Sequence, residues 1–172
     1  MPHIDLLHPS RRLYAHRLEN ARLITLEDFI LGVRRNGDVP GHEIPQRYFD
    51  WLKNRDGRLM EDVFYHNRLD VVSMASLLKH LSDLVQGSHD APYAHHVDLF
   101  LTAKLHQDRG DLETAKRFYE PLIGSVQADV AQNARKSLSL IHKKTNQWNE
   151  AVSLWNEIIA LDPYDLFAAE GI

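Results

Sequence analysis

The sequence predicts a mainly α-helical protein in two parts. Apolar side chains recur at spacings of three and four residues over most of the chain, as one buried face of a helix requires. Segments rich in Gly, Pro, Asn and Asp punctuate these stretches. Residues 110–119 and 146–155 also resemble one another, and an internal repeat of helical segments indicates stacked helix pairs.

Composition limits the class of protein. A chain of 172 residues suffices for one ordinary domain or two small ones, and 44% hydrophobic with 26% charged residues is typical of a soluble globular protein. The absence of cysteine excludes disulfides and thiolate metal sites. No apolar run is long enough to span a membrane, and Met1–Asp5 does not resemble a signal peptide. We therefore expect a cytoplasmic location and no membrane partner.

The net charge of −4 is unevenly distributed. Residues 1–58 carry ten Lys and Arg against eight Asp and Glu, whereas residues 59–172 carry ten against sixteen. The basic N-terminal part fits either a weak phosphate-facing patch or ordinary solvated helix faces. The acidic remainder argues against a protein that binds nucleic acid along its whole surface.

The first helices are predicted from their capping residues. Residues 3–9 suggest the end of a strand followed by a turn. Ser10 is a suitable N-cap for a short helix that follows. Thr25 and Asp28 resemble a capping box, which would open a second helix that ends near Asn36.

Turn residues divide the next stretch. Residues 38–41 form a Pro-Gly turn, and Pro45 then occupies the first turn of a helix, where its missing N–H costs nothing. That helix ends within residues 54–57. A long helix follows at residues 59–86, and residues 87–92 break the pattern and predict the domain boundary.

The long helix carries the clearest candidate site in the sequence. One polar residue, Asn67, falls on its apolar stripe, and His66 and Asp70 lie four residues apart, on one side of the helix. From the residues alone, this pair is either a site or two ordinary polar residues at a core boundary. The stripe predicts a buried face made of Met60, Phe64, Val71, Met74, Leu78, Leu81 and Val85.

The repeat defines the second predicted domain, residues 93–172. Ala115 and Ala151 occupy equivalent positions, an aromatic residue follows each, and Pro163 closes the second copy. This pattern resembles the tetratricopeptide repeat. The first copy departs from it, because Pro121 interrupts its second helix. The resemblance implies four helices in TPR-like α-hairpins that offer a surface for a protein partner.

Three stretches together resemble one bacterial family. They are residues 5–13, which include Asp5-Leu6-Leu7, residues 23–48, and residues 66–74, which include His66-Asn67 and Asp70-Val71-Val72-Ser73-Met74. The chain resembles the C-terminal part of a YprB-like, ribonuclease H-like 3′–5′ exonuclease of the DEDD type. The resemblance implies that residues 1–87 are the helical C-terminal portion of an α/β nuclease domain whose central sheet is missing.

The resemblance also implies a chemistry. Such enzymes bind nucleic acid and hold two divalent ions, Mg²⁺ or Mn²⁺, with four carboxylates from three motifs. His66 and Asp70 match the third motif, with Asp70 as a metal ligand and His66 as the group that orients or deprotonates the attacking water. Tyr65 is a rival for the second role. Carboxylates suit hard cations, and histidine titrates near neutral pH.

The first two motifs of the family are not found. Asp111-Leu112-Glu113 lies in the repeat region, and Phe49-Asp50 follows a helical pattern. Three of the four carboxylates are thus lacking. We expect a truncated nuclease that is inactive as this chain alone and binds no metal by itself. The alternative is a TPR-like interaction module without catalysis. In either case the helices at 25–34 and 59–86 should expose apolar faces, and the chain should be unstable or self-associate.

Two further groups of side chains are weaker candidates. Three histidines could hold a metal but lack regular spacing, and three aromatic residues could stack on a base, although a buried helix face is the better explanation. The first group is His89, His95 and His96, and the second is Tyr48, Phe49 and Trp51.

Overall fold

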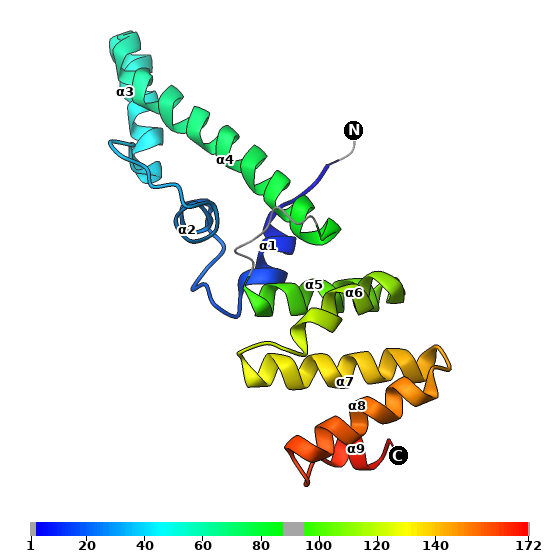
Figure 1. Cartoon of the computed structure of the whole chain (residues 1–172). Helices are drawn as coiled ribbons and strands as arrows, with labels where there is room; N and C mark the ends of the chain where they lie inside the picture. The colour runs from blue at the N-terminus through cyan, green and yellow to red at the C-terminus, as the bar shows by residue number, and fades with distance from the viewer. Residues whose placement is uncertain (1–2, 88–94, 172) are drawn as a thin grey trace. The chain divides into compact units, whose positions relative to one another are not determined.

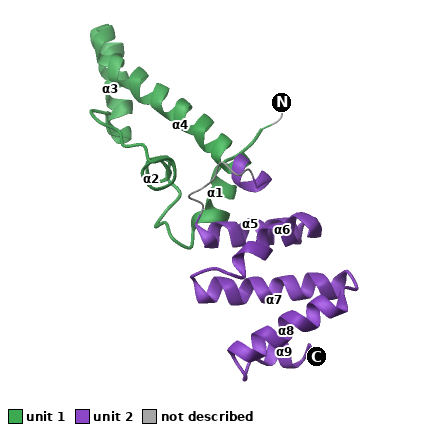
Figure 2. Cartoon of the chain, viewed as in Figure 1, with its two compact units in different colours: residues 1–82 green, residues 83–172 purple. Residues whose placement is uncertain are grey.

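The computed structural model describes residues 3–87 and 95–171, and within them the protein is mainly helical without a strand. The predicted fold class is therefore confirmed. The chain divides into two compact units, residues 1–82 and 83–172 (Figure 2). Among the described residues, no helix combines the length and the apolar composition needed to cross a membrane.

The elements follow in a simple order along the chain (Figure 1). Residues up to 82 contain the helices α1 (Leu7–Tyr14), α2 (Leu23–Leu26), α3 (Ile44–Asn54) and most of α4 (Glu61–Gln86), with a π-helical turn at Glu27–Leu31 and 3₁₀ turns at Gly41–Glu43 and Gly57–Met60. The second unit contains α5 (His96–Asp108), α6 (Leu112–Leu122), α7 (Ala128–Lys144), α8 (Trp148–Leu161) and α9 (Leu166–Ala169).

Helix α1 begins earlier than predicted. Ser10 is not its N-cap but lies inside the helix, fully buried. The side chain of Asp5 accepts a hydrogen bond from the backbone N–H of Leu7 at 2.9 Å and so satisfies one N–H group of the first turn. Pro9 fits because N–H groups in the first turn have no intrahelical partner.

The capping box predicted at Thr25 is also wrong. Thr25 lies within α2, and its hydroxyl donates to the side chain of Asn20 at 2.8 Å, while Asn20 also accepts from the backbone N–H of Arg22. No side chain caps the first turn of α2, and Asn20 instead holds Arg22, the residue before the helix. The π-helical turn ends at Gly32, whose φ of 66° suits glycine, rather than near Asn36.

The predicted bounds of α3 and α4 agree better with the structure. Pro45 lies in the first turn of α3 as expected, and the helix ends at Arg55 with a left-handed backbone. Helix α4 extends to Gln86 as predicted, with a 3₁₀ turn in place of its first residues. The boundary predicted at residues 87–92 lies largely outside the described residues, and the domain division remains a prediction.

The face that α4 buries differs in part from the predicted one, although Leu81 is buried as predicted. Phe64, Val71, Met74 and Leu78 are 67%, 55%, 46% and 41% exposed. The sheltered side lies at neighbouring positions with the same three-and-four spacing, so periodicity alone did not distinguish the two faces. It consists of Val63, His66, Asp70, Ser73, Leu77, Leu81 and Leu84, of which the last four are buried.

Exposed apolar faces on these helices were predicted, and the structure confirms them. Besides the residues of α4, Ile24, Phe29 and Val33 are 60%, 64% and 44% exposed. No strand of the described chain covers them. The first unit therefore presents an apolar surface larger than scattered single residues would give.

The second unit packs as successive helix hairpins. Helix α5 packs on α6, α7 packs on α8, and α6 packs on α7. Ala115 and Ala151, the small residues of the repeat, are fully buried. The main core contains Ala103, Phe118, Tyr119, Leu122, Val130, Ala134, Leu138, Ile141 and Leu154, and a second cluster contains Trp155, Ile158 and Ala168.

Helix α6 continues through Pro121 and ends one residue later, at Leu122. The loop that follows leads into α7, which begins at Ala128. The four helices predicted for the repeats are all present. Their assignment to the tetratricopeptide class remains a prediction.

Candidate functional site

His66 and Asp70 lie one turn apart on the sheltered side of α4. The distance from His66 Nε2 to Asp70 Oδ2 is 3.5 Å, and the two side chains are 18% and 33% exposed. The helical spacing places them together, as the sequence predicted. The residues that surround them come from the segment between α2 and α3.

Asp38 is the main partner of His66. Its Oδ2 atom lies 2.9 Å from His66 Nδ1 and 2.9 Å from Arg35 Nη1. Arg35 also reaches α4, because its Nη2 donates to Asp70 Oδ1 at 2.6 Å. The guanidinium thus joins the two carboxylates that flank the imidazole.

Glu27 holds the other side of Arg35. The guanidinium donates from Nε to Glu27 Oε2 at 2.6 Å and from Nη2 to Oε1 at 2.5 Å. The side chain of Glu27 is 1% exposed and that of Arg35 is 7% exposed. Removing one partner of a buried, bidentate pair usually costs about 3–5 kcal/mol, because the other charge is left uncompensated. This pair therefore anchors the cluster.

The carboxylates outnumber the cation. Glu27, Asp38 and Asp70 surround one guanidinium, and the hydrogen bond to Glu27 is the main reason that the pKa of Arg35 is raised. Burial by itself raises the pKa of the Asp38 carboxyl, but hydrogen bonds from Arg35 and His66 outweigh burial and leave that pKa below its ordinary value of 3.8. Asp38 is thus ionised at neutral pH.

The charge of Asp38 fixes the tautomer of His66. An ionised carboxylate only accepts hydrogen bonds, so the imidazole must donate from Nδ1. In the neutral ring, the lone pair is then on Nε2, on the side of Asp70. That arrangement is suited to a general base, because a carboxylate orients the ring while the free nitrogen accepts a proton.

A pocket of about 560 Å³ opens beside these groups. Its acidic lining is Asp38 and Asp70, and its basic lining includes Arg22 and Arg35. His66 also lines it, so the candidate base faces space that a ligand can enter. The remaining wall is Leu23, Ile24, Gly37, Val39, Pro40 and Gly41.

The described residues do not form a complete two-metal site. Glu27 is occupied by Arg35, and one oxygen of Asp70 accepts from the same guanidinium. Two oxygens are left: Asp70 Oδ2, and Asp38 Oδ1, which is buried and accepts no hydrogen bond from any described residue. A pair of Mg²⁺ ions requires more oxygen ligands than these two, and the nearby guanidinium repels cations.

Sequence reasoning missed three members of this cluster. Asp38 was assigned only to a turn, and Glu27 and Arg35 received no role. All three lie in the middle stretch that carries the family resemblance, so the pattern contained the signal. Their separation in sequence, up to 35 residues between Arg35 and Asp70, hid the contact.

Tyr65 and the histidines considered as a metal site have other partners than the His66 cluster. Tyr65 is 36% exposed, and its ring stacks with the guanidinium of Arg68 at 5.3 Å. His89 lies outside the described residues. His95 caps α5 by accepting from Val97 N–H, and His96 lies 2.6 Å from Ser125 Oγ, so the two described histidines have different partners.

The aromatic residues of α3 do not form the expected buried face. Tyr48 and Phe49 are 44% and 61% exposed, and their ring centroids lie 5.9 Å apart. Trp51 is half-buried, and its ring centroid lies 5.6 Å from that of Tyr48. The alternative that these rings stack on a base remains a prediction.

Comparisons with known proteins relate the chain to a family. A family model described as the ribonuclease H superfamily matches residues 1–82, which contain the whole cluster. The chain is 36% identical over 156 residues to "Uncharacterized protein YprB" of Bacillus subtilis (strain 168). This alignment covers 91% of the chain but only 37% of that relative. No solved structure matches the chain. These findings assign the chain to the YprB-like, ribonuclease H-like proteins.

Proposed function

We propose that residues 1–82 supply the third-motif helix of a metal-dependent 3′–5′ exonuclease that acts on nucleic acid. The observation that carries this proposal is the position of His66, oriented by Asp38 and beside Asp70, in the part of the chain that matches the ribonuclease H superfamily. The cytoplasmic location expected from the sequence belongs to the same proposal.

His66 has a defined task in this function. Its Nδ1–H is held by Asp38, and its Nε2 accepts a proton from the water that attacks a phosphodiester. Asp70 Oδ2 is the free oxygen nearest to that nitrogen and is the proposed ligand for Mg²⁺ or Mn²⁺. When bound, the ions would stabilise charge on the phosphate and lower the pKa of the water.

The 172-residue chain does not hydrolyse nucleic acid by itself in this proposal. The two available carboxylate oxygens are too few for a pair of ions. The missing ligands come from polypeptide that corresponds to the rest of the relative, of which this chain spans 37%.

An exonuclease assay tests the proposal. Single-stranded and double-stranded DNA and RNA with labelled 5′ ends are incubated with Mg²⁺ or Mn²⁺ and the chain, alone and together with the rest of the relative. We expect activity only in the mixture, and its loss in Asp70→Ala and His66→Ala. Glu61→Ala, an exposed carboxylate of α4, is the control and should retain activity. Activity in the mixture that survives Asp70→Ala would refute the assigned role.

The alternative function is a helical interaction module. It is favoured by a pocket of about 690 Å³ in the second unit, lined by Arg135, Lys136 and Asp165 among others. A peptide with both charges would suit such a lining. An inactive mixture, combined with binding of a protein partner that Arg135→Glu abolishes, would favour this function over the nuclease.

A further inference from the structure

The pocket beside His66 is lined by two arginines that differ in what they contact. The guanidinium of Arg35 donates to the three carboxylates of the cluster. Arg22, immediately before α2, has an exposed side chain that forms no hydrogen bond or ion pair with any residue that the structure describes. Arg35 therefore holds the cluster together, whereas the side-chain donors of Arg22 are available to a ligand.

The backbone of Arg22 is held firmly although its side chain is not. Its N–H donates to Asn20 Oδ1 at 3.0 Å, and its carbonyl accepts from the N–H groups of Thr25 and Leu26, each at 3.0 Å. Asn20 is itself fixed, because it also accepts from the hydroxyl of Thr25 at 2.8 Å. The long side chain of Arg22 thus starts from a fixed point at the edge of the pocket.

Three other arginines of the first unit are paired with carboxylates. Arg34, Arg47 and Arg58 each donate to an aspartate at 2.6–2.8 Å. None of the three lines the pocket beside His66. Arg22 differs on both counts, because its guanidinium has no acidic partner among the described residues and lies on the wall that His66 shares.

The rest of the wall suits an elongated ligand with an anionic group. Gly37 and Gly41 leave open the space that a Cβ atom would occupy, so a ligand can approach the backbone there. Leu23, Ile24 and Pro40 add apolar surface, and Ile24 is 60% exposed. The volume of about 560 Å³ lies within the range of about 300–1,000 Å³ that is usual for ligand sites. A nucleotide combines an anionic phosphate with a less polar sugar and base.

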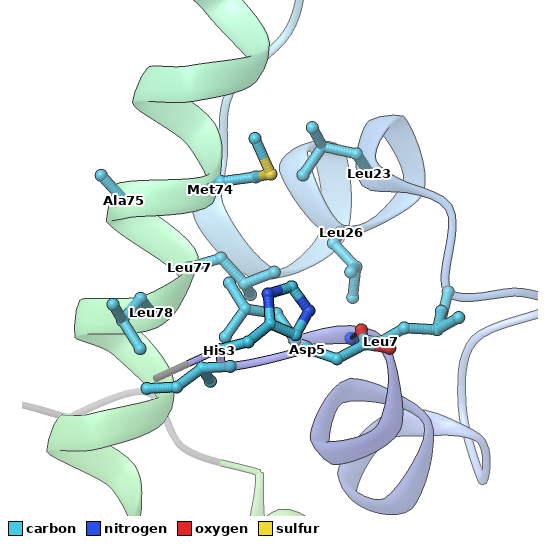
Figure 3. Close-up of a pocket in the computed structure, with 12 residues that line it drawn as sticks. His3, Asp5, Leu7, Leu23, Leu26, Met74, Ala75, Leu77 and Leu78 are labelled. Atoms are coloured by element: carbon cyan, nitrogen blue, oxygen red, sulfur yellow. Dashed lines mark hydrogen bonds between the residues drawn. The ribbon is translucent and has the colours of Figure 1, made fainter. Parts of the chain in front are cut away.

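The apolar groove between residues 3–7, α2 and α4 differs in chemistry (Figure 3). Leu23, Leu26 and Leu77 are among the residues that line it, and no Lys or Arg does. A phosphate would meet no cation in that groove. The pocket of Arg22 instead combines a cation with His66 and Asp70.

We propose that Arg22 binds a backbone phosphate of the nucleic-acid strand that is hydrolysed beside His66. This inference rests on the proposed function and adds a substrate-binding residue to it. The planar guanidinium can donate two parallel hydrogen bonds to phosphate oxygens. Such a contact holds the strand in the pocket without reading its bases.

The charge of the cluster gives this contact its importance. Three carboxylates surround one guanidinium, so the cluster repels a phosphate when His66 is neutral. Arg22 offsets part of that repulsion. Because the contact is with the strand backbone, its loss should weaken binding to all sequences alike and reduce the dependence on salt.

The experiment measures the binding of the full 172-residue chain to a short single-stranded DNA with a fluorescent label, by anisotropy in Mg²⁺ at several salt concentrations. We expect Arg22→Ala to weaken binding about tenfold and to reduce the slope of log affinity against log salt by about 1. Arg22→Lys should keep the slope but recover only part of the affinity, because lysine retains the charge without the planar fork. The NMR amide signals of Gly37 and Gly41 should shift when the DNA binds.

Arg11 of α1 provides a matched control. Its side chain is also exposed, forms no ion pair with any residue in the described part of the chain, and does not line this pocket. Arg11→Ala therefore removes the same charge and should leave the affinity nearly unchanged. Equal weakening by Arg11→Ala and Arg22→Ala would overturn the contact, as would an absence of DNA binding by the unsubstituted chain.

The exonuclease assay with the rest of the relative separates this inference from the proposed function. There Arg22→Ala should raise KM about tenfold and change kcat and its pH dependence little, whereas His66→Ala should abolish activity. An active mixture in which Arg22→Ala behaves as Arg11→Ala does would overturn the role of Arg22 and retain the exonuclease. An inactive mixture, with DNA binding that still depends on Arg22, would retain the phosphate contact and refute the exonuclease.

Discussion

The two units of the chain differ in what fills their interiors. Among the described residues, fourteen of the twenty-one exposed large hydrophobic side chains belong to residues 1–82. The second unit instead gathers its apolar side chains into two clusters between successive helices. The first unit also buries apolar side chains, such as Leu13, Leu26 and Leu77, and adds to them a buried ionic cluster around Arg35 that joins the segment after α2 to α4.

The difference lies in how each unit disposes of its apolar side chains. Helix hairpins bury apolar side chains against sequence neighbours, as α5 does on α6 and α7 on α8. The first unit uses specific charge pairs, which set geometry but contribute little net stability. Its exposed apolar side chains include Phe29, Phe64 and Val71.

Removing the guanidinium of Arg35 should have the largest effect on the stability of the first unit relative to the second. Arg35→Ala leaves Glu27 buried without its partner, and we expect a loss of about 3–5 kcal/mol in the free energy of unfolding of the first unit. Denaturant unfolding followed by hydrogen exchange would locate the loss. The neighbouring Arg34, whose side chain is 84% exposed, is the control, and Arg34→Ala should cost little. Equal effects would show that the cluster does not anchor the unit.

Ile158→Ala should create a cavity in the second unit. We expect it to lower the free energy of unfolding of that unit nearly as much as Arg35→Ala lowers that of the first, and to leave the first unit unchanged. Ile158 is fully buried in the cluster with Trp155. Truncation to alanine usually costs about 2–5 kcal/mol, from lost burial and the cavity left behind. The same exchange experiment should show loss restricted to residues after 83. Val152→Ala, at a position 37% exposed, is the control and should change stability much less.

Acid should weaken the first unit through Asp38. Because the pKa of Asp38 is lowered from 3.8 in the folded chain, its contribution is complete above that value and is lost as pH falls below it. We expect Asp38→Asn to cost about 1.5–3 kcal/mol at pH 7, the range for hydrogen bonds to charged groups. The difference from the unsubstituted chain should shrink near pH 3. Asp28→Asn, at an exposed pair with Arg34, should show no such convergence.

The smallest effect on stability should come from a substitution among the exposed apolar side chains of α4, which are Phe64, Val71, Met74 and Leu78. Leu78→Glu should change the free energy of unfolding by no more than about 0.5 kcal/mol, as surface substitutions usually do. It should nevertheless reduce the binding of a hydrophobic dye and any self-association, measured by fluorescence and light scattering. Leu140→Glu, at a position of α7 that is 44% exposed, should reduce neither. A chain that melts as a monomer without binding dye would contradict the exposed surface.

The sequence predicted much of the fold from local signals. Pro45, the turn at residues 54–57 and the equivalent alanines Ala115 and Ala151 located their helices correctly, because turns and hairpins depend on neighbouring residues. Caps were predicted less well, since neither Ser10 nor Thr25 is the N-cap of its helix.

The candidate site was predicted only in part. Helical spacing alone brought His66 and Asp70 together, because residues four apart share a side of any α-helix. Glu27, Arg35 and Asp38 join them across loops, and their contacts arise from packing that no local pattern encodes. The role of the cluster in hydrolysis remains a proposal.

The sequence by itself determined the helical class and the pairing of His66 with Asp70, since both follow from local periodicity. Only the tertiary structure decided which face of α4 is sheltered and which charges surround His66. The physical reason is that α4 has two faces with the same three-and-four spacing. The contact of Arg35 with Asp70 and the burial of Leu77 belong to one of them, whereas Phe64, Val71, Met74 and Leu78 of the predicted stripe are exposed.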